Sequence, residues 1–160
     1  MRRAEQIRYL ALAVQREGNR QLTELLRPVG LTPAQSEVLR ILGDHAPMTL
    51  RELGRMLVCD SGENPSRLVD KLVSRGFVDR RPGVEDRRRV VLTLTPDGRA
   101  READVRAIED GVYDAIDAVF AGAEADTLVA SLRTMVAGSP AGTALATRIA
   151  AEHAESSGTV

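Results

Sequence analysis

The chain has 160 residues, of which 43% are hydrophobic and 2% aromatic, so it can build one domain, with or without a helical extension, around aliphatic side chains. Its apolar runs are shorter than the ~20 residues that a membrane helix needs, and its charged N-terminus is unlike a signal peptide, which predicts a cytoplasmic protein with no membrane partner. One cysteine excludes an internal disulfide, and with only two histidines it argues against a zinc site, so we expect no metal and no cofactor.

The net charge of −1 hides an uneven distribution along the chain. Residues 64–101 carry ten Arg or Lys against five Asp or Glu, whereas residues 102–160 carry three against ten. The middle of the chain is therefore basic and its C-terminal part acidic. This distribution predicts one surface for nucleic acid and a second surface with another role.

Two helices are predicted in the first part of the chain. Apolar residues at three- and four-residue spacing predict a helix over residues 3–28. A helix start follows, because Thr32 can cap a helix, Pro33 suits its first position and Gln35 can complete a capping box. We expect this second helix to end near Gly43.

The next segment carries two more helix starts. Residues 49–52 have the spacing of a second capping box and predict a helix over about residues 49–58. Asn64 and Pro65 then open another helix, for which Gly76 is the C-terminal stop.

A two-stranded β-hairpin is predicted next, with strands over residues 77–81 and 89–95 joined by a turn over 82–88. Three adjacent arginines lie at or beside this turn: Arg87, Arg88 and Arg89. A helix of a size to enter a groove, followed by an arginine-bearing turn, is typical of DNA-binding proteins. Asp86 would repel DNA if it were free, so we expect it to pair with an arginine and to set the turn.

Apolar stripes separated by glycine breaks predict three further helices, over residues 96–121, 124–137 and 141–154, and a frayed tail over 155–160. The stripes of the first and last helices are too extensive for the small central unit to cover. The simplest way to bury them is a homodimer in which the terminal helices of two chains interdigitate.

Two motifs resemble those of one protein family. Residues 86–88 (DRR) followed by 92–98 (LTLTPDG) are similar to its wing signature. Residues 66–72 (SRLVDKL) followed by 76–78 (GFV) are similar to its recognition helix and the exit from that helix. Both lie in the expected order after residues 31–35 (LTPAQ), so the chain resembles the MarR family of bacterial transcriptional regulators.

The resemblance covers about residues 5–137 and implies a mainly α-helical fold with a small β-hairpin wing. Residues 31–95 would form a winged helix-turn-helix lobe that binds DNA, and residues 1–30 and 96–154 a helical dimerisation region. Family members usually repress transcription by occupying a palindromic operator, which is an inverted repeat in double-stranded DNA. Many release it when a small aromatic or phenolic effector binds between the lobe and the dimerisation region.

Four residues of the predicted recognition helix are candidates for DNA contact. Arg67 and Lys71 are four residues apart and share a helical face, from which Arg67 can bond a guanine edge and Lys71 a guanine or a phosphate. Asn64 and Ser66 lie at the helix N-terminus, where they can meet a phosphate, cap the helix or do both. The alternative for Arg67 and Lys71 is a solvated helix face.

In the predicted wing, the resemblance places Arg87 in a minor groove, with Arg88 or Arg89 on a phosphate. A narrow A·T-rich groove attracts such a guanidinium through its negative potential. The alternative is a turn that only keeps the protein soluble. Weaker candidates for phosphate contact are Thr49, Arg51, Arg80 and Arg81.

The segment before the recognition helix departs from the family pattern. Residues 59–66 are about two residues longer than the usual turn, so the helix can start at Asn64 or at Ser61. Cys59 in this segment has two interpretations, an oxidation sensor or buried filler. Its acidic neighbour Asp60 disfavours a thiolate, and the sensing cysteines of the family lie in the first helix, so we predict buried filler.

Tyr9 and Tyr113 fall on the helices of the predicted dimer, where they either line an effector pocket or pack. No nucleophile–base constellation and no Gly-rich phosphate loop is present, so no enzymatic activity is expected. The sequence predicts a homodimeric, sequence-specific DNA-binding regulator that represses a palindromic operator and is released by an effector. The alternatives are a winged-helix module that binds proteins without specific DNA binding, and an effector-binding protein whose DNA contact is incidental.

Overall fold

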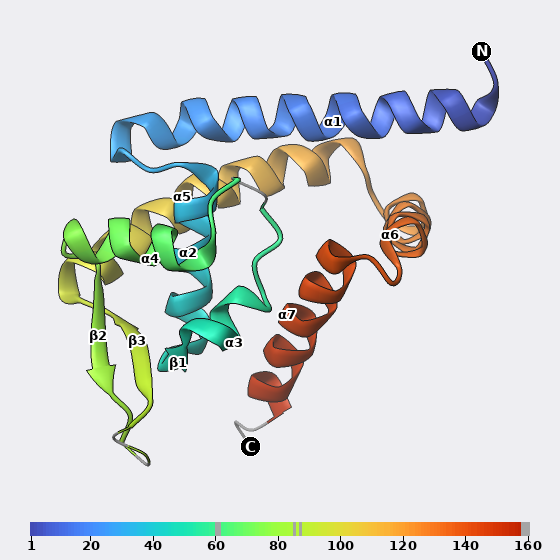
Figure 1. The fold of residues 1–160 in the computed structure, drawn as a ribbon. Coiled ribbons are helices and arrows are strands. Elements are labelled where there is room, and N and C mark those ends of the chain that lie inside the picture. The colour runs from blue at the N-terminus through green and yellow to red at the C-terminus, as the bar shows by residue number, and fades with distance from the viewer. Residues whose placement is uncertain (60–61, 85, 87, 158–160) are drawn as a thin grey trace.

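The computed structural model describes residues 1–59, 62–84, 86 and 88–157 and is mainly helical with a small antiparallel sheet, as predicted (Figure 1). In chain order the elements are α1 (Arg3–Leu26), the 3-10 helix η1 (Arg27–Val29), α2 (Pro33–His45), β1 (Met48–Thr49), α3 (Leu50–Gly54), α4 (Pro65–Ser74), β2 (Val78–Pro82), β3 (Val90–Leu94), α5 (Pro96–Val119), α6 (Ala123–Val136) and α7 (Pro140–Ser157).

The predicted helix starts are confirmed by their caps. The Thr32 hydroxyl accepts the backbone N–H of Gln35 at 3.3 Å, and the Gln35 side chain accepts the N–H of Thr32 at 3.1 Å. Thr49 and Glu52 form the same reciprocal box at the start of α3. Each box satisfies two of the N–H groups that a helix start leaves without an intrahelical partner.

Several helix ends differ from the prediction, among them that of α1, which ends at Leu26 instead of 28, and that of α5, which ends at Val119 instead of 121. α2 continues past Gly43 to His45, while α7 runs to Ser157 instead of ending at 154. α3 ends at Gly54 instead of near 58. The early end of α3 has a clear cause, because the next N–H groups, those of Arg55 and Met56, turn back to carbonyls three residues earlier and so close the helix.

The sheet has three strands in the order β1-β3-β2. The prediction of a two-stranded hairpin therefore missed one strand, β1. β1 has two residues, Met48 and Thr49, which pair with β3. So short a strand has no alternation that a sequence pattern could reveal. In the β2–β3 hairpin Val78 pairs with Leu94, and both side chains are buried.

One hydrophobic core fills the lobe between α2, α3, α4 and the sheet. Its fully buried side chains include Leu39, Ile41, Leu53, Leu72 and Leu92. Removing each of these side chains from water stabilises the fold by about 1.5–3 kcal/mol before entropic costs. α4 is therefore held against the core by one face and presents the other to solvent.

Gly98 in the first turn of α5 explains one position of the wing motif. A Cβ atom at this residue would lie 1.9 Å from the carbonyl oxygen of Phe77, which is less than any real contact. The same carbonyl accepts the backbone N–H of Thr95 at 3.1 Å. Only glycine allows α5 to start this close to the end of α4 and the beginning of β2.

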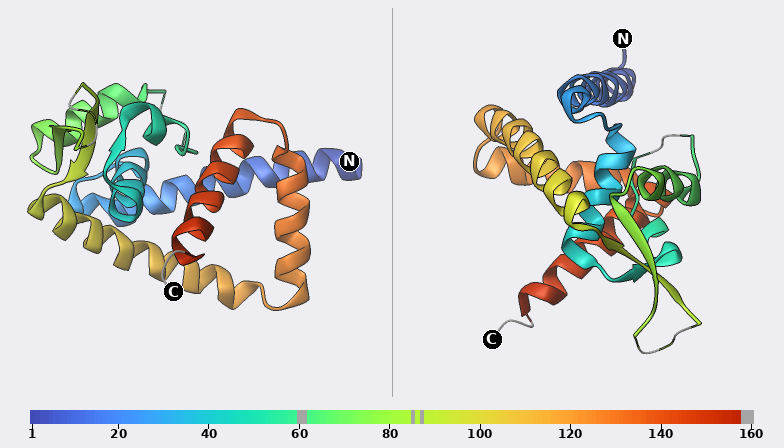
Figure 2. Two further views of the ribbon diagram at one scale, coloured as in Figure 1. Left: turned by 90° about the horizontal axis from the view of Figure 1, so that it is seen from below. Right: turned by 90° about the vertical axis from the view of Figure 1, so that its left-hand side faces the viewer.

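The long helices leave the lobe with little covering. α5 runs away from the lobe below α1, α6 turns across at its far end, and α7 returns toward the lobe (Figure 1). The views in Figure 2 show the same open arrangement of α5, α6 and α7. Large apolar side chains on α1, α5 and α6 are exposed: Ile7, Leu10, Val14, Leu25, Ile116, Val119, Leu128, Val129, Leu132, Met135 and Val136.

Candidate nucleic-acid interface

Helix α4 has the geometry expected of a recognition helix. Its N-cap is Asn64, whose side-chain oxygen accepts the backbone N–H of Arg67 at 2.9 Å, and Pro65 occupies the first position. The helix therefore starts at the later of the two predicted positions. Leu68, Val69 and Leu72 are buried beneath it, so its exposed face carries Arg67, Asp70 and Lys71, whereas Ser66 is half-buried.

The charges on this face are partly paired within the protein. Lys71 forms an ion pair with Glu63, and Asp70 forms one with Arg80 at 2.5 Å. Within the described part of the chain the guanidinium of Arg67 has no carboxylate partner. Surface pairs of this kind contribute little to stability, so a phosphate can replace the carboxylate at low cost.

The wing holds the other predicted contacts. Arg87 lies outside the described residues. Asp86 sets the turn as predicted, but through the backbone, because its carboxylate accepts the N–H of Arg88 at 2.9 Å and its carbonyl accepts that of Arg89 at 3.0 Å. The side chains of Arg88 and Arg89 are both exposed. The turn therefore presents at least these two cations to solvent.

Carboxylates also accompany the weaker candidates. Arg81 pairs with Asp79 at 2.7 Å, and Arg89 pairs with Glu52 at 3.2 Å. The hydroxyl of Thr49 donates to Glu52 at 2.8 Å, so it is engaged inside the protein. The backbone N–H of Thr49 and then its hydroxyl lower the pKa of Glu52, which therefore stays ionised beside Arg89. Arg51 on α3 is exposed.

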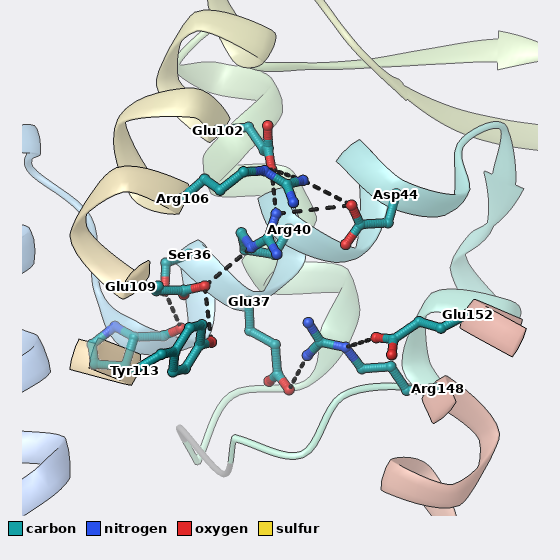
Figure 3. Close-up of polar contacts among 11 residues, drawn as sticks. Ser36, Glu37, Arg40, Asp44, Glu102, Arg106, Glu109, Tyr113, Arg148 and Glu152 are labelled. Carbon is teal, nitrogen blue, oxygen red and sulfur yellow. Dashed lines mark hydrogen bonds and ion pairs between the residues drawn. The ribbon is translucent and has the colours of Figure 1, made fainter. Parts of the chain in front are cut away.

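A cluster of partly buried charges connects the lobe to the long helices (Figure 3). Arg40 of α2 contacts Glu102 at 2.7 Å and Glu109 at 3.0 Å, both on α5. Arg106 of α5 contacts Glu102 at 2.6 Å and reaches back to Asp44 of α2 at 2.8 Å. These contacts fix α2 against α5. We call Arg40, Asp44, Glu102, Arg106 and Glu109 the α2–α5 charge cluster.

The sequence did not reveal this cluster. The acidic charge of residues 102–160 predicted a second surface with another role, whereas Glu102 and Glu109 pair with arginines inside the protein. Burial raises the pKa of Glu109 against the opposing effect of Arg40. The signal that could have found the cluster is the spacing of Glu102, Arg106 and Glu109, which places all three on one face of a helix.

The remaining predicted residues are not gathered into one site. Tyr113 donates to Glu109 at 3.3 Å at the edge of the α2–α5 charge cluster. Burial, then the charge of Glu109, raises its pKa. Tyr9 is exposed on α1, with its ring 5.1 Å from the guanidinium carbon of Arg8. These contacts leave the predicted effector pocket as a prediction.

Cys59 is exposed, so the prediction of buried filler is wrong. The loop after α3 runs along the surface instead of continuing a helix into the core. The thiol is nevertheless a poor nucleophile, because partial burial and the neighbouring carboxylate of Glu37 raise its pKa to about 12.

In the described residues, every helix is too short or too polar to cross a membrane.

Comparisons with known proteins place these features in context. Residues 31–90, which include the lobe from α2 to the start of β3, match the model of the MarR family. The chain is 31% identical over 98 residues to the organic hydroperoxide resistance transcriptional regulator of Bacillus subtilis, a match that covers 61% of this chain and 66% of that protein. It is 38% identical over 87 residues to the multiple antibiotic resistance protein MarR of Escherichia coli, covering 54% of this chain and 60% of that protein.

The alignments to these two curated relatives thus span about two thirds or less of their lengths. A solved structure extends the match. A cysteine-to-serine mutant of E. coli MarR complexed with operator DNA aligns with a TM-score of 0.69 at 30% identity. That alignment covers 80% of this chain and 91% of the other.

Proposed function

This chain belongs to the MarR family of transcriptional regulators, and we propose that it is a homodimer that represses transcription from an inverted-repeat operator. The similarity to regulators also agrees with the expectation that it is not an enzyme. In the proposed arrangement residues 31–95 bind DNA, and residues 1–30 and 96–154 hold the two chains together. Such a regulator works in the cytoplasm.

One observation carries the DNA-binding part of the proposal. The outer face of α4 presents Arg67, which has no carboxylate partner among the described residues, and α4 is seated by three buried side chains. A guanidinium on a rigid helix can bond the edge of a guanine with two parallel donors. Arg88 and Arg89 are exposed on the adjoining wing, and in the proposed complex they would meet the backbone of the same duplex.

The homodimer is supported by the long helices. α1, α5 and α6 expose large aliphatic side chains along their lengths, more than a soluble single chain ordinarily leaves uncovered. Charge favours the pairing of unlike helices across the interface. Residues 1–30 carry six Arg against three Glu, and residues 104–136 carry two Arg against seven Asp or Glu. A second chain can thus offer a basic α1 to an acidic α5–α6 pair.

Selection of bound duplexes from a random pool tests the proposal. The expected product is an inverted repeat with half-sites about one helical turn, ~10 bp, apart. Affinity for it should fall steeply with salt, with a slope of about 0.9 for each neutralised phosphate. A pool that yields no enriched sequence would contradict the proposal and favour a winged-helix module that binds proteins.

The most specific part of the proposal is that a small effector releases the protein from DNA. The half-buried phenol of Tyr113 beside the α2–α5 charge cluster supports it, because a ligand held there would touch both the lobe and the long helices. Thermal-shift screening with aromatic and phenolic acids tests it. A stabilising acid that lowers operator affinity is the expected result, and a panel without any such acid would contradict this part alone.

A further inference from the structure

The loop between α3 and α4 is held by a side chain from another helix. Glu37 of α2 is buried, and its two carboxylate oxygens accept the backbone N–H groups of Val58 at 2.9 Å and Cys59 at 2.8 Å. Hydrogen bonds to an ionised acceptor are stronger than neutral ones. These two fix the loop six residues before the first residue of α4, where no secondary structure holds it.

The same carboxylate faces the C-terminal helix. Arg148 of α7 lies 3.7 Å from Glu37 and 3.6 Å from Glu152, the next turn of its own helix (Figure 3). The side chains of Glu37 and Arg148 are 8% and 20% exposed. A carboxylate buried as deeply as that of Glu37 is costly in free energy unless a cation compensates its charge. Arg148 is thus the cation that compensates Glu37.

α7 presents one continuous face to the lobe. Ala144 is buried, Arg148 follows four residues later, and Ala151 packs against the hydrophobic core. Spacings of four and three residues put all three on one side of a helix. Val58 and Cys59 line one wall of a groove whose other wall includes Ala144 and Thr147. The helix therefore borders the same groove as the loop along about one turn.

The position of α7 is set by a tight corner with α6. Gly142 approaches the carbonyl oxygen of Val136 so closely that a Cβ atom would lie 2.1 Å from it. α7 also lies beyond residues 5–137, over which the motifs of the family extend.

We propose that Glu37 and Arg148 are a positioning pair through which α7 holds residues 55–59, the described part of the connection from α3 to α4, in the arrangement that reads DNA. The inference rests on the proposed DNA-binding function. Because Glu37 is buried and Arg148 lies on α7, outside the proposed DNA-binding lobe, we expect neither side chain to touch DNA. With the pair intact the chain is fixed at Val58 and Cys59, six residues before α4.

The test combines hydrogen exchange of the free protein with binding to two duplexes, the sequence selected by the wild type and a random one. Arg148→Gln removes the compensating charge and keeps a polar side chain. We expect the amides of Val58 and Cys59 to exchange several times faster, and affinity for the selected duplex to fall roughly three- to tenfold, as for loss of one charge-assisted contact. Affinity for the random duplex should be unchanged, since the phosphate contacts remain.

Three further variants separate positioning from general stability. Arg148→Lys keeps the charge and should restore most of both properties. Glu37→Gln should speed exchange at the same two amides, because an amide side chain offers one acceptor in place of two. Ala154→Gln is the matched control, because Ala154 is exposed on the same helix, and it should change neither property.

Unchanged exchange in Arg148→Gln would overturn the inference, as would an equal loss of affinity for both duplexes. So would an Ala154→Gln variant that behaves like Arg148→Gln. If the wild type selects no DNA, the proposed function fails and the DNA consequence fails with it. The exchange measurement still decides, without DNA, whether α7 holds the loop.

Discussion

The lobe and the long helices are built from the same aliphatic residue types, yet they expose them very differently. In the lobe Leu39, Leu53 and Leu72 are completely buried. On α1 Leu10 is 64% exposed and Val14 72%, and on α5 Val119 is 70% exposed. The lobe thus completes its core within one chain, whereas the long helices have exposed apolar faces that the proposed homodimer would cover.

The largest effect is expected in the lobe. Leu39→Ala should lower the free energy of unfolding by about 3–5 kcal/mol, because it leaves a cavity in a fully enclosed core. Urea denaturation at a fixed protein concentration measures it. A loss below about 1 kcal/mol would mean that the core of the lobe is less tightly packed than its burial indicates.

The second prediction concerns the exposed apolar faces of the long helices. Leu10→Asp should cost almost nothing in a single chain, since the residue is exposed there, but it would bury a charge in a dimer. We expect the dissociation constant of the dimer to rise more than about 100-fold, ~2.7 kcal/mol. Analytical ultracentrifugation measures it.

Val84→Asp is the control for that experiment. Val84 is 98% exposed on the wing, far from the proposed interface, so the dimer should be unaffected. A wild-type protein that sediments as a monomer, or a Leu10→Asp variant that remains a dimer, would contradict the assignment of α1 to the interface.

The third prediction compares an arginine of the lobe with an arginine of the long helices. Arg67→Ala should reduce discrimination between the selected sequence and single-base variants by about 1–3 kcal/mol at the base pair that it contacts. Arg133→Ala on α6 removes an exposed arginine from the long helices and should leave discrimination unchanged. Competition binding with single-base variants measures both. A uniform loss for all sequences would make Arg67 a phosphate contact.

The smallest effects concern pH, and the two regions should differ in sign. Burial raises the pKa of Glu109, so its contribution to stability is full below the unfolded value near 4.5 and declines as the pH rises through the folded pKa. Contacts with Thr49 lower the pKa of Glu52, so its contribution is present above about 4.5 and is lost as the pH falls through the folded pKa.

Unfolding of Glu109→Gln and Glu52→Gln between pH 3 and pH 8 measures these contributions by difference from the wild type. The stability of the wild type relative to Glu109→Gln should decline as the pH rises, and relative to Glu52→Gln it should grow. Differences of the same sign would show that one of the two environments is described wrongly.

Sequence alone predicted the elements whose signals are local. The caps at Thr32, Thr49 and Asn64 were found because a capping residue and its partner lie within three residues of each other. Contacts between distant segments were not found. β1 is recognised only by its pairing with β3, and Glu37 had no visible role, because its partners at Val58, Cys59 and Arg148 come together only after folding.

In the candidate interface, too, local signals were predicted and contacts between distant segments were not. Charge and spacing were sufficient to propose Arg67 and Lys71, but not to reveal that Glu63 lies beside Lys71 or that Asp70 binds Arg80. Simple counts of charge by segment therefore overstate the free positive charge of the lobe. They also overstate the negative charge of α5, because Arg40 and Arg106 neutralise Glu102 and Glu109.

The ion pairs of the α2–α5 charge cluster fix α2 of the lobe to α5. We therefore expect the lobe to move with α5 as one rigid unit when α5 rotates. α5 has 24 residues, which at 1.5 Å per residue makes it ~36 Å long. A tilt of about 10° over such a length displaces its end by ~6 Å, nearly two steps along the axis of a duplex at 3.4 Å each. A slight splaying at the far end would therefore be enough to put two successive grooves out of reach.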